Sequence, residues 1–250
     1  MATGYRWDSS AAAESYDAGA PAIHPFYVAV QDEILRLLAA HAAAAVREPA
    51  YVVDLGGGSG RLIERVLEQF PHAHGVVMDQ STAFLGIAER RLAKFGARAS
   101  FVERRLQDDW TAAFPQRPDV LVSTSAIHHL EPHEKEAVYQ RSFDALALGG
   151  IFINGDEFRP ESDADFLACL NWWWQQKDVE MAAGRIPKSF GPLFDAWYER
   201  NITQFGQPKK SGDDCLETAA VQVEYLRKAG FRDVELSWNE QLWGVLVGRR

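Results

Sequence analysis

A glycine-rich turn at residues 52–60 restricts the folds open to this chain more than any other feature. A short apolar run ends at Asp54, glycines follow at positions 56, 57, 58 and 60, and a helical pattern begins at Arg61. A strand that ends in glycines before a helix lets a ligand approach the backbone, because a Cβ would occupy the ligand's space. The dinucleotide fingerprint needs Gly or Ala three residues after its second glycine, where this chain has Arg61 or Ile63. The spacing therefore argues against a dinucleotide.

A second acidic residue, Asp79, ends the apolar run at residues 75–78. An acid at the tip of the second strand of a βαβ unit is placed to accept hydrogen bonds from both ribose hydroxyls of a nucleoside. Asp79 could instead cap the helix that follows. The two roles are compatible, because Ser81 or Thr82 can take the cap.

The composition narrows the class of protein further. A chain of 250 residues can form one α/β domain with an insertion. Its formal net charge of -9 argues against a large nucleic-acid footprint. Cys169 and Cys215 lie far apart without metal-ligand spacing, and no apolar run has the length of a signal peptide or membrane span. We therefore expect a reduced, cytoplasmic protein that binds neither nucleic acid nor membranes.

Apolar strands alternate with helical patterns along most of the chain, which predicts an α/β fold with a doubly wound parallel sheet. The expected strands cover residues 50–55, 74–79, 99–104, 119–124, 150–156, 231–238 and 241–248. The expected helices cover residues 60–70, 81–95, 132–147, 162–183, 190–205 and 216–229. Before them, a helical pattern from Ala11 to Val46 is interrupted near Gly19-Ala20-Pro21 and at His24-Pro25.

We expect a single domain over residues 1–250, with two additions to the sheet. Residues 1–48 form an N-terminal helical cap. Residues 157–213 break the strand–helix rhythm, are rich in Trp, Phe and Asp, and form a helical lid. Trp238-Asn239-Glu240 supplies the turn of a final hairpin.

The pattern Asp-x-Gly-x-Gly-x-Gly that begins at Asp54 resembles the first motif of class I S-adenosylmethionine-dependent methyltransferases. Residues 226–234 resemble the last helix–strand step of the same family, and the resemblance extends over about residues 16–250. It implies a seven-stranded, mostly parallel sheet whose last strand is antiparallel. It also implies S-adenosyl-L-methionine as the cofactor and S-adenosyl-L-homocysteine as the product.

The resemblance assigns cofactor contacts to the first two strand ends. Gly56, Gly57 and Gly58 would face the methionine and ribose parts of the cofactor. Asp54 would orient the loop or reach the amino group through water. Asp79 would bind the ribose, and Gln80 would lie against the adenine edge.

At the end of the third strand the sequence departs from the family pattern, and the residue that binds adenine N6 stays open. Arg105 stands where the family carries an acid, so the backbone of Leu106 is expected at adenine N1, and the N6 partner stays open between Gln107 and Asp108. Ser123 and its neighbours would offer carbonyls to the cofactor's ammonium group. The expected cofactor residues are Tyr16, Asp54, Gly56, Gly57, Gly58, Asp79, Gln80, Leu106, Gln107 and Ser123.

Two adjacent histidines follow the fourth strand, where the methyl group of the cofactor should point. His128 is our candidate general base, because an imidazole titrates near neutrality, and His129 is a candidate for binding the acceptor. Either ring could simply stabilise the turn, since many methyl transfers need little beyond alignment. We expect no metal, because adjacent side chains point apart and no third ligand follows at the usual spacing.

The run Trp172-Trp173-Trp174 lies in the expected lid. Three consecutive residues cover nearly the whole circumference of a helix, so they cannot all face the core. We expect Trp172 and Trp173 to line the acceptor site, which suits an aromatic, apolar or cationic acceptor. Tyr16-Asp17 and His24-Pro25-Phe26-Tyr27 would form the opposite wall. Alternatively, the tryptophans clamp the lid onto the domain or onto a dimer partner.

These features predict a monomeric or homodimeric enzyme that methylates an oxygen or nitrogen of a small aromatic or apolar molecule. One alternative is a transferase similar to carboxy-S-adenosylmethionine synthase, which would need a lid arginine to hold a carboxylate. Arg159, Arg185 and Arg200 are available for that. Another alternative is a non-catalytic cofactor-binding subunit.

Overall fold

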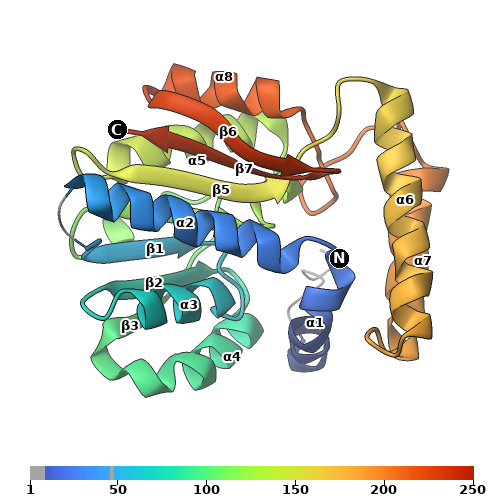
Figure 1. Ribbon diagram of the computed structural model, residues 1–250, viewed down its shortest axis with the longest axis horizontal. Helices are drawn as coiled ribbons and strands as arrows, with labels where there is room; N and C mark the ends of the chain where they lie inside the picture. The colour runs from blue at the N-terminus through green and yellow to red at the C-terminus, as the bar shows by residue number, and fades with distance from the viewer. Residues whose placement is uncertain (1–8, 46–47) are drawn as a thin grey trace.

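The computed structural model describes residues 9–45 and 48–250, and its centre is a seven-stranded sheet in the order β3-β2-β1-β4-β5-β7-β6 (Figure 1). Strands β1 to β5 pair in parallel, and β7 pairs antiparallel with both β5 and β6. The strands are β1 Tyr51–Leu55, β2 His74–Asp79, β3 Ala99–Glu103, β4 Val120–Thr124, β5 Ile151–Glu157, β6 Arg232–Glu240 and β7 Trp243–Arg249. The doubly wound sheet with an antiparallel last strand, expected from the sequence, is confirmed.

Helices cover both faces of the sheet, α2, α3 and α4 on one side and α5 and α8 on the other. The α-helices are α1 Ser10–Ile23, α2 Tyr27–Ala45, α3 Arg61–Gln69, α4 Thr82–Leu92, α5 Pro132–Ala145, α6 Asp163–Ala182, α7 Gly191–Tyr198 and α8 Ala219–Ala229. The shorter helical turns are η1 Ala93–Arg98, η2 Thr111–Ala113, η3 Ile127–His129, η4 Lys188–Phe190 and η5 Glu199–Thr203. None of the helices in these described residues is long and apolar enough to cross a membrane.

The central strand β1 is buried along its whole length, which explains its nearly continuous apolar sequence. Val52 packs with the α2–α3 face and Val53 with the α5–α8 face, because successive side chains of a strand point to opposite sides. The strand order reverses on either side of β1, which lies between β2 and β4. In open α/β sheets, ligands bind beyond the carboxyl ends of the strands at such a switch point.

Helix α1 runs unbroken through Pro21, so the interruption expected near Gly19-Ala20-Pro21 is wrong. Proline has no N–H for the carbonyl four residues earlier, which here belongs to Asp17. Arg61 Nη2 donates to that carbonyl at 2.8 Å instead. The expected break at His24-Pro25 is present, and Val46 lies outside the described residues.

The final hairpin turns two residues later than expected. Asn239 pairs with Gly244 and Glu240 with Trp243, so Trp238-Asn239-Glu240 belongs to strand β6 and not to the turn. Gln241 makes the turn with a φ of 53°, and Asn239 Nδ2 donates to Trp243 O at 2.9 Å. Although asparagine is typical of turns, Asn239 therefore stabilises the pairing of β6 with β7 from within the strand.

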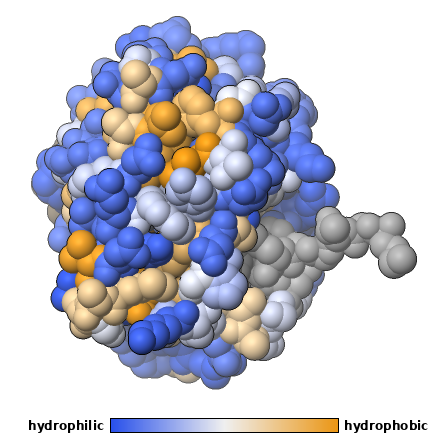
Figure 2. Space-filling view, turned by 90° about the vertical axis from the view of Figure 1, so that its right-hand side faces the viewer, coloured by the Kyte–Doolittle hydropathy of each residue, from blue (hydrophilic) through white to orange (hydrophobic). Residues whose placement is uncertain are grey.

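Helices α6 and α7 stand beyond the carboxyl ends of the strands, opposite α1, where a lid was expected (Figure 1). The face of the molecule on this side is mixed, with small hydrophobic clusters between hydrophilic residues (Figure 2). The division into a cap at 1–48 and a lid at 157–213 stays a prediction.

Candidate active site

A cavity of about 690 Å³ opens at the carboxyl ends of β1 to β4, at the switch point. We call it the cofactor cavity. Nearly all of the cofactor residues expected from the sequence line it. Those lining it are Tyr16, Asp54, Gly56, Gly57, Gly58, Asp79, Gln80, Leu106 and Gln107.

The glycine turn after β1 has a shape that only glycine accepts readily. Gly56 and Gly58 have φ values of 72° and 52°, in the left-handed region. The N–H groups of Gly56 and Gly57 both donate to Met78 O, at 2.8 and 3.0 Å, which folds the turn over the end of β2. A Cβ on Gly57 would lie 2.9 Å from Asp54 Oδ2. The turn therefore keeps its backbone at the wall of the cavity.

The Asp79 carboxylate holds this turn and still faces the cavity. Its Oδ2 accepts from Gly58 N at 3.0 Å, and its Oδ1 accepts from Ser81 N at 2.8 Å. Ser81 Oγ accepts from Phe84 N, so Ser81 takes the helix cap. Burial raises the pKa of Asp79, while these backbone N–H groups oppose the rise. Each oxygen keeps a lone pair, which suits the two hydroxyls of a ribose.

Asp54 lies beneath the turn, and its Oδ1 is buried without a hydrogen-bond partner among the described residues. Burial, with a contribution from the charge of Asp79, raises its pKa to about 8. Asp54 is therefore mostly neutral at pH 7. A buried carboxyl group without a partner, at the wall of a cavity, fits the amino group of S-adenosylmethionine, and the whole donor set fits the cofactor.

The loop after β3 is held in place mainly through Leu106. Its carbonyl accepts from Trp110 Nε1 at 3.2 Å and from Arg141 Nη1 at 3.1 Å. Asp108 Oδ2 accepts from Arg105 N at 3.1 Å, so this carboxylate closes the loop, whereas Gln107 lines the cavity. Gln107 is thus the better placed of the two candidates for adenine N6.

A second, smaller cavity of about 70 Å³ adjoins the first, and we call it the acceptor cavity. Three residues line both: Tyr16, Ser125 and His129. Ser125 has a φ of 51°, which is uncommon for a residue with a side chain and often marks functional sites. The complete lining is Tyr16, Ile23, His24, Ser125, His128, His129, Glu157, Trp173, Leu193, Phe194, Trp197, Arg200 and Asp214.

His128 is buried and tied to Asp156. Its backbone N–H donates to Asp156 Oδ2 at 2.9 Å, and its Nδ1 lies 2.5 Å from Asp156 Oδ1. Burial alone would lower the pKa of His128, but the charges of Asp156, Glu157 and Asp214 outweigh it and raise the pKa to about 9. His128 is therefore an imidazolium at pH 7, paired with a carboxylate.

His129 faces a different set of oxygens. Its Nδ1 lies 3.1 Å from Asp213 O and 3.4 Å from Asp214 Oδ1. A carbonyl can only accept, so this contact places a proton on Nδ1. Asp214 is itself held by Asn201, whose Nδ2 donates to Asp214 Oδ2 at 2.6 Å.

The two imidazoles do not point apart, as the sequence had suggested. Their ring centroids lie 3.9 Å apart, because both project from the short turn η3 toward Asp214. His128, His129 and Asp214 offer ligand atoms within 4.8 Å of one another, close enough to hold a metal ion. The third group comes from a segment far along the chain, so spacing around the histidines could not reveal it.

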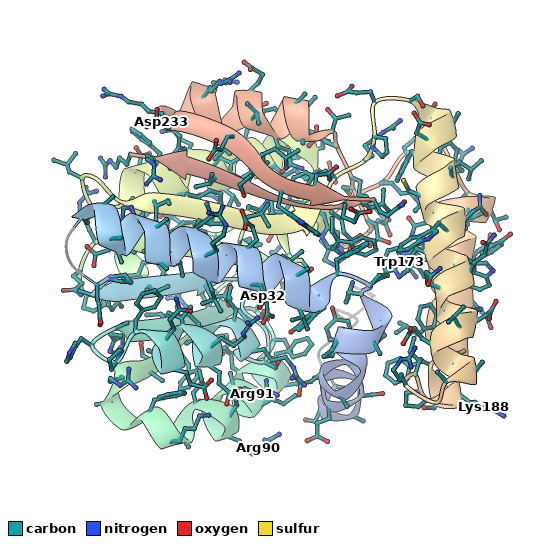
Figure 3. All side chains as sticks on the ribbon, viewed as in Figure 1. Asp32, Arg90, Arg91, Trp173, Lys188 and Asp233 are labelled. Atoms are coloured by element: carbon teal, nitrogen blue, oxygen red, sulfur yellow. The ribbon has the colours of Figure 1, made fainter. Side chains whose placement is uncertain are left out.

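The three tryptophans of α6 have three different surroundings, as helix geometry requires. Trp173 is buried, lines the acceptor cavity and donates from Nε1 to Ile23 O at 2.9 Å (Figure 3). Trp172 does not line it, because it stacks on Phe26 with ring centroids 5.9 Å apart. Trp174 packs against Tyr198, with Lys177 over its ring.

Two other expected residues lie elsewhere than the sequence suggested. Ser123 is buried, and its Oγ donates to Leu55 O at 2.8 Å, so Thr124 and Ser125 line the cofactor cavity in its place. Tyr27 lines the cofactor cavity and not the acceptor cavity, since it begins α2 on the side of Asp17 and Arg61.

Sequence reasoning missed Glu157 and Asp214 as site residues, whereas His24 belongs to the expected wall and lines the acceptor cavity. His24 Nε2 lies 2.8 Å from Tyr16 Oη, and its Nδ1 lies 3.6 Å from Glu157 Oε1. The apolar run of β5 ends in the acidic pair Asp156-Glu157, at the same sheet edge as Asp54 and Asp79, and this signal could have pointed to Glu157.

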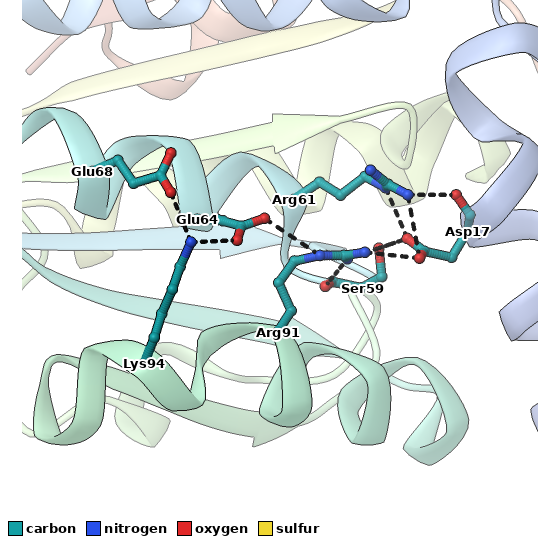
Figure 4. A network of polar contacts seen from close by, with 7 residues as sticks. All are labelled: Asp17, Ser59, Arg61, Glu64, Glu68, Arg91 and Lys94. Carbon is teal, nitrogen blue, oxygen red and sulfur yellow. Dashed lines mark hydrogen bonds and ion pairs between the residues drawn. The ribbon is translucent and has the colours of Figure 1, made fainter.

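Helix α1, which carries Tyr16, is fastened to the domain through Asp17 (Figure 4). Asp17 accepts from Ser59 Oγ at 2.5 Å, Arg61 Nε at 2.8 Å and Arg91 Nη2 at 2.8 Å. Burial alone would raise the pKa of Asp17, but Arg91, Ser59 and Arg61 outweigh it and lower the pKa. The carboxylate stays charged and anchors one wall of both cavities.

Comparison with known proteins agrees with this geometry. Residues 53–152 match a family model described as a methyltransferase domain. A release factor glutamine methyltransferase of Cereibacter sphaeroides is 44% identical over 81 residues, which cover 32% of this chain and 28% of that protein. A carboxy-S-adenosyl-L-methionine synthase of Campylobacter lari is 28% identical over 153 residues, covering 61% of this chain and 62% of that protein.

Among solved structures, human N-acetylserotonin methyltransferase in complex with S-adenosylmethionine is similar with a TM-score of 0.63 at 15% identity, over 100% of this chain and 60% of that one. This chain spans less than two thirds of the length of the two curated relatives. The methyltransferase domain match is confined to residues 53–152, and the sheet order and the structural likeness show the class I methyltransferase fold.

Proposed function

We propose that this chain methylates an oxygen or nitrogen atom of a small aromatic or apolar molecule bound in the acceptor cavity. The observation that carries the proposal is the shared boundary of the two cavities at Tyr16, Ser125 and His129. Bound S-adenosylmethionine supplies an activated methyl group. A second cavity of only about 70 Å³ beside its site favours a small acceptor.

In this proposal, the backbone and two carboxyl groups hold the cofactor. The glycine turn and Asp54 receive its amino acid part, and Asp79 receives its ribose. Helices α6 and α7 cover the acceptor, and Trp173 excludes water from it. Alignment and desolvation are then the main contributions of the protein.

We propose His129 as the group that takes a proton from the acceptor. The argument for His129 is its place at the boundary of both cavities and the contact of its Nδ1 with Asp213 O, which makes Nε2 the nitrogen that would accept the proton. His128, our candidate from the sequence, carries a proton at pH 7 because its pKa is raised to about 9, so it serves poorly as a base there. Its imidazolium instead balances the charges of Asp156 and Asp214.

Turnover with cofactor labelled in the methyl group tests the proposal. The purified protein should convert labelled S-adenosylmethionine to S-adenosylhomocysteine in the presence of a fitting phenol, amine or carboxylic acid, and the label should appear in the acceptor. Tight binding of S-adenosylhomocysteine without turnover across a broad panel of such acceptors would instead support a non-catalytic subunit.

A second candidate, favoured by the similarity to the Campylobacter lari protein, is carboxylation of the cofactor. In that reaction the methyl carbon loses a proton and takes up the CO2 released by an added organic acid that decarboxylates. The same experiment separates it from methyl transfer, because the product is then a heavier nucleoside that retains the label. Mass spectrometry of the nucleosides bound to the protein distinguishes the two products.

A further inference from the structure

Arg200 is the one half-buried arginine whose guanidinium lacks a polar partner among residues 9–45 and 48–250, and it lines the acceptor cavity. Its Nε is buried and makes no hydrogen bond there. Arg105 and Arg232 also lack a partner in this part of the chain, but they are exposed, where water solvates the charge. A partly buried cation without a protein partner keeps only part of its hydration, so its presence at a cavity calls for an explanation.

The other arginines of the lid are used differently. Arg159 pairs with Asp163, and Arg185 Nε lies 2.5 Å from Glu180 Oε2. Both acidic partners lie on α6, and the arginine–carboxylate pairs do not line the acceptor cavity. Arg200 alone among these three turns its charge toward that cavity.

The backbone at Arg200 has an unusual form. Residues Glu199–Thr203 make the π-helical turn η5, in which Gln204 N donates to Glu199 O at 3.0 Å. Such turns insert one extra residue into a helix and are frequent at functional sites. Asn201, on the same turn, fixes Asp214 through its side chain. The turn thus sets the positions of both Arg200 and Asp214.

The carboxylates in the cavity already face imidazoles. Glu157 lies 3.6 Å from His24, and Asp214 lies 3.4 Å from His129. Neither forms an ion pair with Arg200 within 4.0 Å. Arg200 is therefore the positive charge that the cavity leaves for a ligand.

We infer that the acceptor carries a carboxylate, or an anionic group of the same geometry, and that Arg200 binds it. A guanidinium offers parallel N–H donors that match a carboxylate. The flat rings of Trp173 and Trp197, 4.7 Å apart, suit the apolar remainder of such a molecule. The inference rests on the proposed function and narrows its acceptor to small organic acids.

The test uses the whole chain saturated with S-adenosylhomocysteine, and benzoate and crotonate as probes, each beside its neutral amide. Calorimetry should show that each carboxylate binds and that its amide binds at least about tenfold more weakly. Arg200→Met should weaken carboxylate binding about 10- to 100-fold and leave the amide unchanged. The matched control Arg185→Met, which removes an exposed lid arginine that is paired with Glu180, should change neither.

A second measurement guards against a variant that merely misfolds. Arg200→Met should not lower the Tm of the protein without probes, because the guanidinium has no hydrogen-bond partner in the described residues to lose. Benzoate should then raise the Tm of the parent protein but not that of the variant. Methionine keeps much of the length of arginine, so packing is largely retained.

Three results would overturn the inference: equal binding of acid and amide, full carboxylate affinity in Arg200→Met, or preference for benzylamine over benzoate. The last would assign the cavity to a cation held by Glu157 and Asp214. Titration of S-adenosylhomocysteine comes first, and its failure would instead remove the proposed function. A protein that binds S-adenosylhomocysteine but none of the acids removes only the inference about Arg200.

Discussion

The two cavities meet at Tyr16, Ser125 and His129, yet they are built in different ways. The cofactor cavity is built around the turn after β1, with glycines in left-handed conformations and N–H groups fixed by the neighbouring strand β2. The acceptor cavity is lined by side chains from α1, η3, β5, α6, α7, η5 and the segment at Asp214. Backbone built into a sheet leaves little freedom, so this cavity is constrained by the fold. Side chains on a lid can vary, so in the proposed function the second cavity is the part that selects the molecule to be methylated.

The largest effect on turnover should follow from substituting His129, at the boundary between the two cavities. His129→Ala should lower kcat by ~10²-fold or more with little change in cofactor affinity, because the loss falls on proton transfer. Steady-state kinetics beside a titration of S-adenosylhomocysteine measures both. His133→Ala is a matched control, since that imidazole is exposed on α5. Equal losses in the two variants would refute the role of His129.

A loss confined to the cofactor cavity should follow from Asp79→Ala. Removing the carboxylate takes away hydrogen bonds to the ribose and to Gly58, so affinity for S-adenosylhomocysteine should fall by ~1.5–3 kcal/mol. Arg105→Ala should cost less, because a guanidinium offers adenine N6 no acceptor. If Arg105→Ala costs more than Asp79→Ala, the tip of β3 meets the cofactor in a different way.

Substitutions of the α6 tryptophans should distinguish a loss of acceptor binding from a loss of folding stability. Trp173→Phe should raise the acceptor KM several-fold while S-adenosylhomocysteine binds normally, because only the acceptor cavity loses a wall. Trp172→Phe should instead lower Tm modestly through its packing on Phe26, with KM unchanged. If Trp172→Phe moves KM and Trp173→Phe does not, the assignment of these two side chains is reversed.

A smaller effect is expected on the protonation of Asp54 in the cofactor cavity when the cofactor binds. Asp54 is mostly protonated at pH 7 in the free protein because its pKa is raised to about 8. An ammonium group beside it favours the carboxylate and lowers that pKa, so binding should release up to about one proton at pH 7, and less as the pH rises above 8. Calorimetry in buffers of different ionisation enthalpy measures the release. Asp54→Asn should abolish it, and an unchanged release in that variant would exclude Asp54 as the source.

The smallest expected effect is that of a chelator. His128, His129 and Asp214 could hold an ion, but the imidazolium of His128 and the Nδ1 proton of His129 compete with one. Dialysis against EDTA should leave turnover unchanged. Activity lost on dialysis and restored by a divalent cation would make these side chains metal ligands instead.

The cofactor cavity could be predicted from the sequence to a larger extent than the acceptor cavity. The glycine turn and Asp79 lie close together in the chain, so their spacing alone indicated the cofactor site and the strands around it. His24, Glu157, Arg200 and Asp214 come from distant segments, and only the fold brings them together. Helix geometry predicted that the tryptophans would differ, but their contacts depend on partners such as Phe26 and Tyr198, which no local pattern reveals.

Pro21 in α1 affects the order in which the elements of the molecule become stable during folding. Pro21 leaves the carbonyl of Asp17 without its partner inside the helix, and Arg61 provides one. Together with Arg91, it also neutralises the Asp17 carboxylate. During synthesis, α1 therefore leaves the ribosome before the residues that satisfy it exist. Helix α1 should therefore be among the last parts of the described chain to become stable, and proteolysis or hydrogen exchange should find it open while the sheet is already protected.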